Sequence, residues 1–122
     1  MKSILLIEDH PSHRKMLSTV LKRAKYETLE ASNGIEGCQM YRQHPCDLVI
    51  TDICMPEKDG NDVIEELKTE FADVKIIAIS GGGFFRGEVV LDIAKSLGVD
   101  VTLQKPIKMK QLLNKVHELI GE

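Results

Sequence analysis

The sequence predicts an α/β protein, a doubly wound parallel sheet in which five strands alternate with five helices as (βα)5. Two observations carry this prediction. Short apolar runs of strand length alternate with longer segments whose apolar residues recur at helical spacing. Three of the runs, ILLI, LVI and IIAI, are continuous, which is typical of strands buried on both faces. The length of 122 residues fits a single domain, which we expect to span 1–122.

The expected elements follow one another without a linker or a low-complexity stretch. Strands are predicted at 3–8, 27–31, 47–51, 75–80 and 101–104. Helical stripes lie at Met16, Leu17, Val20, Leu21 and Ala24, at Val63, Ile64 and Leu67, at Val89, Val90, Ile93, Ala94 and Leu97, and at Leu112, Leu113, Val116, Leu119 and Ile120. The weakest helix is predicted at 34–43, with Ile35, Cys38 and Tyr41 facing inward.

Residues that begin or end helices agree with these segments. Pro11 suits a first helical turn, and Asn33 followed by Glu36 resembles a capping box. Asp59-Gly60 precedes a helix predicted at 61–69, and Gly98 is expected to end the one at 87–97.

Composition excludes several classes of protein. A net charge of -3 argues against a chain that binds nucleic acid through its backbone. Cys38, Cys46 and Cys54 form no CxxC pair and suit a reducing compartment, and no zinc-ligand spacing is present. No apolar stretch has the length of a membrane span or a signal peptide. We therefore expect a soluble, cytoplasmic protein that binds neither membranes nor nucleic acid directly.

Polar residues stand at the carboxyl ends of four of the five predicted strands. Glu8 and Asp9 follow the first strand, Asp52 the third and Lys105 the fifth, while Ser80 ends the fourth. In a parallel sheet these ends share one edge. With the strand order 2-1-3-4-5, which we adopt from other doubly wound sheets, they surround the crevice where such sheets bind ligands. Each residue alone could be a helix cap or a loop residue, so the convergence carries the argument.

This set of side chains suits a phosphoryl group on an aspartate. Three carboxylates on one edge repel each other unless a cation lies among them, and oxygen ligands favour Mg²⁺ over zinc. Lys105 and the hydroxyl of Ser80 would then contact an anion beside the metal. Asp52 is the central carboxylate and the expected acceptor.

The chain resembles the receiver domain of two-component response regulators over essentially its whole length. The resemblance rests on the order and spacing of Glu8-Asp9, Asp52, Met55-Pro56, Asp59-Gly60, Ser80 and Lys105-Pro106. It implies a flavodoxin-like fold and a phosphohistidine donor on a sensor histidine kinase or a phosphotransfer protein. It also implies that Asp9, Asp52 and the backbone carbonyl of Cys54 ligate Mg²⁺, with Glu8 acting through water. Ser80 would move toward the phosphoryl group, Lys105 would pair with it, and the Lys105-Pro106 bond would be cis.

The resemblance further implies a signalling switch rather than an enzyme, one that catalyses only its own phosphorylation and dephosphorylation. An output protein would bind the face built from helix 87–97, strand 101–104 and the last helix, and the protein would be a monomer or a phosphorylation-dependent dimer. The chain is expected to be a stand-alone receiver or one taken from a longer regulator.

Some residues depart from the family's pattern. Thr102 stands where many members carry an aromatic switch residue, which leaves the relay to the surface open. Cys54 and Gly82 occupy positions that tune phosphate lifetime, and neither orients water, so we expect slow loss of phosphate. His13 is expected to be a surface residue on the first helix, with a part in partner choice.

Two other functions fit the sequence less well. An aspartyl-phosphate phosphatase usually has a second aspartate two residues after the nucleophile, where this chain has Cys54. A flavin binder needs a phosphate loop after the first strand, where Glu8 and Asp9 would repel phosphate.

Overall fold

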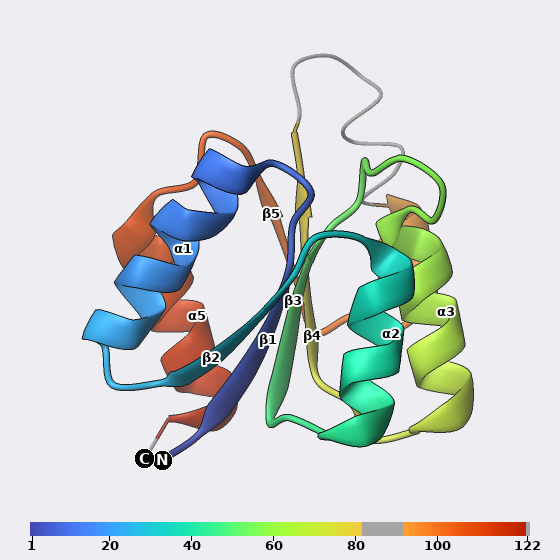
Figure 1. Ribbon diagram of the computed structural model, residues 1–122, viewed down its shortest axis with the longest axis horizontal. Helices are drawn as coiled ribbons and strands as arrows, with labels where there is room; N and C mark the ends of the chain where they lie inside the picture. Colours follow the sequence, from blue (N-terminus) through green and yellow to red (C-terminus); the bar gives the residue numbers. More distant parts are fainter. Residues whose placement is uncertain (82–91, 122) are drawn as a thin grey trace.

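A single parallel sheet forms the centre of the protein. In the computed structural model, which describes residues 1–81 and 92–121, the strands are β1 (Ser3–Ile7), β2 (Glu27–Ala31), β3 (Leu48–Asp52), β4 (Ile76–Ser80) and β5 (Val101–Gln104). All neighbouring strands are parallel and the order is β2-β1-β3-β4-β5, which confirms the predicted fold class and order (Figure 1). Compared with its predicted range of 47–51, β3 begins and ends one residue later. Asp52 therefore pairs with Ile79 inside the sheet instead of following the strand.

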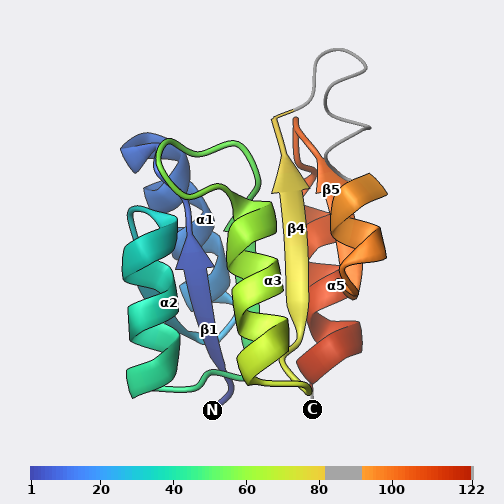
Figure 2. The ribbon, with the colours of Figure 1, turned by 90° about the vertical axis from the view of Figure 1, so that its right-hand side faces the viewer.

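Helices cover both faces of the sheet. α1 (Pro11–Arg23) and α5 (Met109–Ile120) lie on one face, and α2 (Gly34–Gln43) and α3 (Gly60–Glu70) lie on the other (Figures 1 and 2). Residues 92–96 are also helical. Alternate residues of each central strand serve the two faces, so Leu5 packs in the α2–α3 core and Leu6 in the α1–α5 core. No helix among the described residues is long and apolar enough to cross a membrane.

Most of the predicted helical stripes are buried. The confirmed inner residues are Leu17, Leu21, Cys38, Tyr41, Val63, Ile64, Leu67, Ala94, Leu112, Val116 and Ile120. Met16, Ile35 and Ile93 were wrongly placed inside, since their side chains are 45%, 46% and 45% exposed. Val89 and Val90 lie outside the described residues.

Two glycines explain the error at Ile35. The inner face of α2 is formed by Gly34, Gly37, Cys38 and Tyr41, which recur at helical spacing. A Cβ atom on Gly37 would lie 2.4 Å from the Cδ1 atom of Ile7, so the helix approaches β1 more closely than a larger residue would allow. Ile35 therefore points away from the core, because apolar spacing alone does not show that glycine can form the buried stripe.

The predicted helix ends are confirmed. Asn33 Oδ1 accepts the N–H of Glu36 at 2.8 Å, and Glu36 Oε1 accepts the N–H of Ser32 at 2.8 Å, so the return bond reaches one residue further than in the usual capping box. Gly98 adopts a φ of 95° after helical residues 92–96, as a helix-ending glycine does.

Replacing Lys25 by glycine is expected to stabilise the protein by about 1 kcal/mol. Lys25 follows α1 with a φ of 73°, and its N–H and that of Tyr26 cap the carbonyls of Lys22 and Leu21. Glycine adopts this left-handed conformation without the steric cost that a side chain brings. Urea unfolding measures the difference. Lys15→Gly, at an exposed position inside α1, is the control and should destabilise by about 1 kcal/mol; equal signs for the two variants would contradict the prediction.

Candidate functional site

Four charged side chains lie together at the carboxyl end of the sheet. One carboxylate oxygen each from Glu8, Asp9 and Asp52 lies within 4.8 Å of the others. The Nζ atom of Lys105 lies 2.9 Å from Asp52 Oδ2 and 3.2 Å from Glu8 Oε1. Glu8 and Asp9 follow β1, Asp52 ends β3 and Lys105 follows β5, so the strand order brings together residues 97 positions apart. The structure is therefore able to hold a cation between carboxylates and an anion beside a lysine.

Ser80 lies at the same end of the sheet, as the last residue of β4. Its side chain is buried, and its backbone carbonyl accepts the N–H of Lys105 at 2.8 Å. Among the described residues, neither Ser80 Oγ nor Asp52 Oδ1 has a hydrogen-bond partner, although both atoms are buried. Leaving a buried polar atom without a partner costs about 1–3 kcal/mol, so such atoms mark a place where a ligand is expected.

Burial and neighbouring charges set different pKa values for the two buried carboxyl groups. Burial acts to raise the pKa of Glu8, but contacts with His13, the backbone N–H of His10 and Lys105 lower it to about 2. Burial raises the pKa of Asp52 to about 6, with Lys105 opposing this effect and the charge of Glu8 adding to it. The Asp52 carboxyl therefore holds its proton more tightly than an ordinary aspartate, and a divalent cation beside it would favour its ionised form.

The two other charged groups are also perturbed. Burial, together with a hydrogen bond that the Asp9 carboxyl donates to Glu8 and the negative charge of Glu8, raises the pKa of Asp9. Burial acts to lower the pKa of Lys105, but its contacts with Asp52 and Glu8 outweigh burial and raise it. Lys105 is therefore a permanent cation in this site, suited to a ligand that carries negative charge.

Two residues of α1 belong to the site and were not predicted there. His13 Nδ1 lies 2.5 Å from Glu8 Oε1, and its side chain is 20% exposed, so this residue, predicted only on the surface, also contacts the site. Arg14 donates from its NH1 group to the backbone carbonyl of Glu8 at 2.8 Å. Both contacts arise because α1 starts at Pro11, with only one residue between it and the acidic pair, which places the first helical turn close to the strand end. This short connection is the feature of the sequence that could have indicated the contacts of His13 and Arg14.

The segment after Asp52 folds closely against the end of β3. The N–H of Gly60 donates to the carbonyl of Ile53 at 2.7 Å, and a Cβ atom at Gly60 would lie 2.3 Å from the backbone oxygen of Asp52. Cys54 lies in this segment with an exposed side chain. The Lys105-Pro106 peptide bond is cis, as the resemblance implied. Thr102 is half-buried in β5, and Gly82 lies outside the described residues.

The fold is a parallel sheet whose carboxyl edge carries an acidic cluster, a lysine and a serine hydroxyl without a hydrogen-bond partner among the described residues, an arrangement that could hold a cation beside an anion. The sequence profile of the response regulator receiver domain matches residues 4–117. The chain belongs to this family, whose members act in two-component systems and interact with histidine kinases or phosphotransfer partners.

Individual relatives agree with this assignment. The polar-differentiation response regulator DivK of Brucella anthropi is 26% identical over 99% of this chain and 98% of its own length. The probable transcriptional regulator ycf27 of Pyropia yezoensis is 34% identical over 98% of this chain but only 47% of its own length, so the chain spans about half of that relative.

Solved structures show the same fold. A response regulator receiver domain from Clostridium thermocellum superimposes with a TM-score of 0.89 at 26% identity, covering 99% of this chain and 95% of that one. The response regulator TrrA of Thermotoga maritima, solved in complex with Mg²⁺ and BeF, superimposes with a TM-score of 0.85 at 31% identity, covering 98% of this chain and 100% of that one.

Proposed function

We propose that this chain is a phosphorylation switch that accepts a phosphoryl group on Asp52 from a phosphohistidine. The observation that carries the proposal is the state of the Asp52 carboxylate. One of its oxygens contacts Lys105 at 2.9 Å, while the other is buried beside two further carboxylates and has no hydrogen-bond partner in the described part of the chain. A carboxylate in this position has a free oxygen for attack and a fixed cation for the charge that follows.

The residues present fit a magnesium ion. Asp9, Asp52 and the backbone carbonyl of Cys54 would hold it, with Glu8 acting through a water molecule. The support is the set of carboxylate oxygens within 4.8 Å of one another, all of the hard type that Mg²⁺ prefers. When bound, the ion neutralises negative charge on the phosphoryl oxygens and on the acceptor.

The chain's own groups then perform the transfer. A carboxylate oxygen of Asp52 attacks the phosphorus atom, a P–O bond forms, and the P–N bond to the donor imidazole breaks. The imidazole leaves with the electron pair of that bond. Lys105 pairs with an oxygen of the transferred group, and the Ser80 hydroxyl, which has no partner among residues 1–81 and 92–121, donates a hydrogen bond to another. Aspartate is a weak nucleophile, so positioning and charge compensation carry most of the effect.

The acyl phosphate would act as a signal and not as an intermediate in turnover. We place the domain in the cytoplasm, where it catalyses only its own phosphorylation and dephosphorylation. Its output protein would bind the face that includes β5 and α5. Thr102 has no ring to rotate, so movement of Ser80 would have to reach that face through the backbone.

Incubation with acetyl phosphate and Mg²⁺ is expected to add one phosphoryl group, detected by intact mass. Asp52→Asn should abolish the uptake, and Asp59→Asn, in the same segment, is the matched control that should retain it. Omitting Mg²⁺ should also abolish it. Absence of uptake by the unchanged protein, or steady hydrolysis of assorted phosphate esters, would contradict the proposal; the second result would indicate a phosphatase instead.

The phosphorylated protein is expected to lose its phosphate slowly, over minutes or longer. The exposed Cys54 side chain, two residues after the acceptor, has no carboxylate or amide with which to orient an attacking water molecule. Release of inorganic phosphate after removal of the donor measures the rate. Loss within seconds would contradict the prediction.

A further inference from the structure

The segment between β3 and α3, residues 53–59, connects the proposed acceptor, Asp52, to the face of the sheet that α2 and α3 cover. It contains a residue in an unfavourable conformation: Glu57 has a φ of 66°, and the N–H of Lys58 donates to the carbonyl of Pro56 across it at 2.8 Å. A residue other than glycine keeps such a conformation only where its surroundings hold it. The neighbouring residue, Lys58, is held through both its side chain and its backbone.

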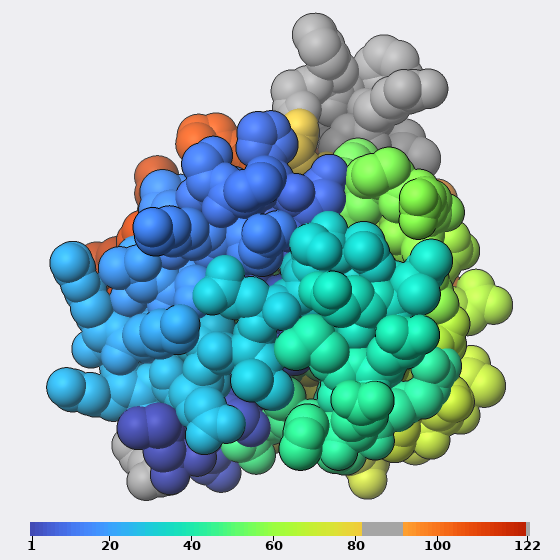
Figure 3. Space-filling view, viewed as in Figure 1, coloured from blue at the N-terminus to red at the C-terminus, as the bar shows by residue number. Residues whose placement is uncertain are grey.

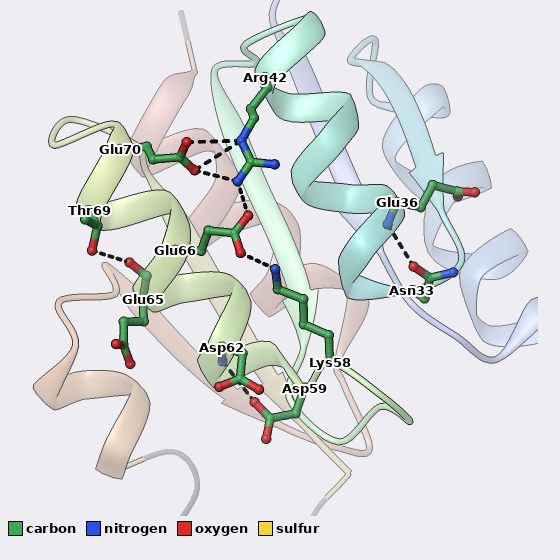
Figure 4. A network of polar contacts seen from close by, with 10 residues as sticks. All are labelled: Asn33, Glu36, Arg42, Lys58, Asp59, Asp62, Glu65, Glu66, Thr69 and Glu70. Atoms are coloured by element: carbon green, nitrogen blue, oxygen red, sulfur yellow. Dashed lines mark hydrogen bonds and ion pairs between the residues drawn. The ribbon is translucent and has the colours of Figure 1, made fainter.

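The side chain of Lys58 is held in an ion-pair network between α2 and α3 (Figure 4). Lys58 Nζ contacts Glu66 Oε1, and the other oxygen of Glu66 contacts Arg42 of α2. Arg42 also donates from Nε to both oxygens of Glu70 at 3.1 Å. The Lys58 and Glu66 side chains are only 21% and 28% exposed, so this part of the network is partly shielded from water. The contact with Lys58 is the largest influence on Glu66 and lowers the pKa of its carboxyl group.

The backbone of Lys58 is also fixed. A Cβ atom on Gly34 would lie 2.7 Å from the carbonyl oxygen of Lys58, so the start of α2 is pressed against this part of the segment. In the space-filling view the segment between β3 and α3 (green) lies directly beside α2 (Figure 3). Arg42 already joins α2 to α3 through Glu70 without Lys58. The contact between Lys58 and Glu66 therefore adds no link between the helices; it ties the segment to them.

We propose that Lys58, held by Glu66, is a positioning residue that fixes the segment 53–59 and thereby sets the affinity of the acidic site for Mg²⁺. The inference rests on the proposed function, because it takes the Cys54 carbonyl in this segment as a metal ligand. A ligand supplied by the backbone has no side-chain freedom, so its position depends on what holds the segment around it. Loss of the contact between Lys58 and Glu66 should leave the carboxylates in place and move the carbonyl.

Calorimetric Mg²⁺ titration of the full chain tests the proposal. Lys58→Met, which keeps the apolar stem and removes the charge, should weaken Mg²⁺ binding by about tenfold, the usual scale for residues that position a ligand. Lys58→Arg should restore binding to within about twofold of the unchanged protein. Lys115→Met makes the same chemical change in an exposed pair on α5, Lys115 with Glu118, and should leave the Mg²⁺ affinity unchanged.

Arg42→Met distinguishes an effect on the position of the segment 53–59 from a general loosening of the packing between α2 and α3. It breaks the link between α2 and α3 but leaves Lys58 beside Glu66, so Mg²⁺ affinity should stay near that of the unchanged protein. Amide hydrogen exchange at Gly60, whose N–H bonds to Ile53 at 2.7 Å, gives a reading without metal. Exchange should be faster in Lys58→Met than in Arg42→Met. Unchanged Mg²⁺ affinity in Lys58→Met, or equal loss in both variants, would overturn the proposal.

The failure of this inference differs from the failure of the proposed function. If the unchanged protein takes up phosphate on Asp52 and Lys58→Met binds Mg²⁺ equally well, only the positioning role is lost. If Lys58→Met weakens Mg²⁺ binding but no protein takes up phosphate, only the acceptor role of Asp52 is lost. A chain that binds no Mg²⁺ at all overturns both.

Discussion

Gly60→Ala is expected to destabilise the protein by about 3 kcal/mol and to disturb the acceptor carboxylate. The added Cβ atom would lie 2.3 Å from the backbone oxygen of Asp52 and 2.6 Å from the Cα atom of Ile53. Both are main-chain atoms of the central sheet and its exit, so no side-chain rotation relieves the overlap. Either α3 or the end of β3 must move, and the hydrogen bond from Gly60 to Ile53 is stretched in both cases.

Urea unfolding measures this loss, and acetyl phosphate uptake reports the effect on the site. The matched control is Gly81→Ala, where the nearest atom to an added Cβ is Lys105 Cδ at 3.7 Å, an ordinary contact. That control should unfold within about 0.5 kcal/mol of the unchanged protein. An unaltered unfolding midpoint for Gly60→Ala would show that the strand end yields more easily than its hydrogen bonds suggest.

Asp52→Asn is expected to make the metal-free protein more stable at neutral pH, by about 2–3 kcal/mol. The folded pKa of Asp52 is about 6, above its ordinary value of 3.8. Because the folded chain holds this proton more tightly than the unfolded chain, the stability contribution is complete below the ordinary pKa. It is lost as the pH rises through about 6. Asparagine does not titrate, so the variant avoids the loss.

Unfolding midpoints from pH 4 to pH 8 in the presence of a chelator test the sign. The unchanged protein and Asp52→Asn should have similar unfolding midpoints near pH 4. Above pH 6 the midpoint of Asp52→Asn should be the higher one, by an increasing margin. Asp73→Asn, at an exposed turn, is the control and should follow the unchanged protein. Mg²⁺ should then reduce the difference in stability between Asp52→Asn and the unchanged protein, because it stabilises the protein that binds it. At ten times its dissociation constant this stabilisation is about 1.4 kcal/mol. A variant that is less stable at every pH would contradict the prediction.

Much of the fold could be predicted from the sequence because its signals are local. Continuous apolar runs identified the buried strands. Helix ends were marked by the capping bond of Asn33, the fixed backbone of Pro11 and the positive φ of Gly98. The error at Ile35 has a non-local cause, since the close approach of Gly37 to Ile7 depends on how α2 packs against the sheet.

The candidate site divides in the same way. The carboxylates and Lys105 could be predicted to converge because parallel strands place their ends on one edge. The contact between His13 and Glu8 could not, because it depends on the orientation of the first turn of α1. The contact between Lys58 and Glu66 could not be predicted from the sequence, since charged residues at such spacing usually face solvent.

Within the part of the chain that the structure describes, Asp52 Oδ1 and Ser80 Oγ are buried without a hydrogen-bond partner, and this bears on how the domain would respond to selection for stability. Ser80→Ala, which removes one of these atoms, is expected to relieve an unfavourable burial and so to raise the melting temperature. The same substitution removes a group that we propose receives the phosphoryl group. A laboratory screen for heat resistance would therefore select variants at these positions. Such variants would have higher thermal stability but would have lost the proposed signalling activity.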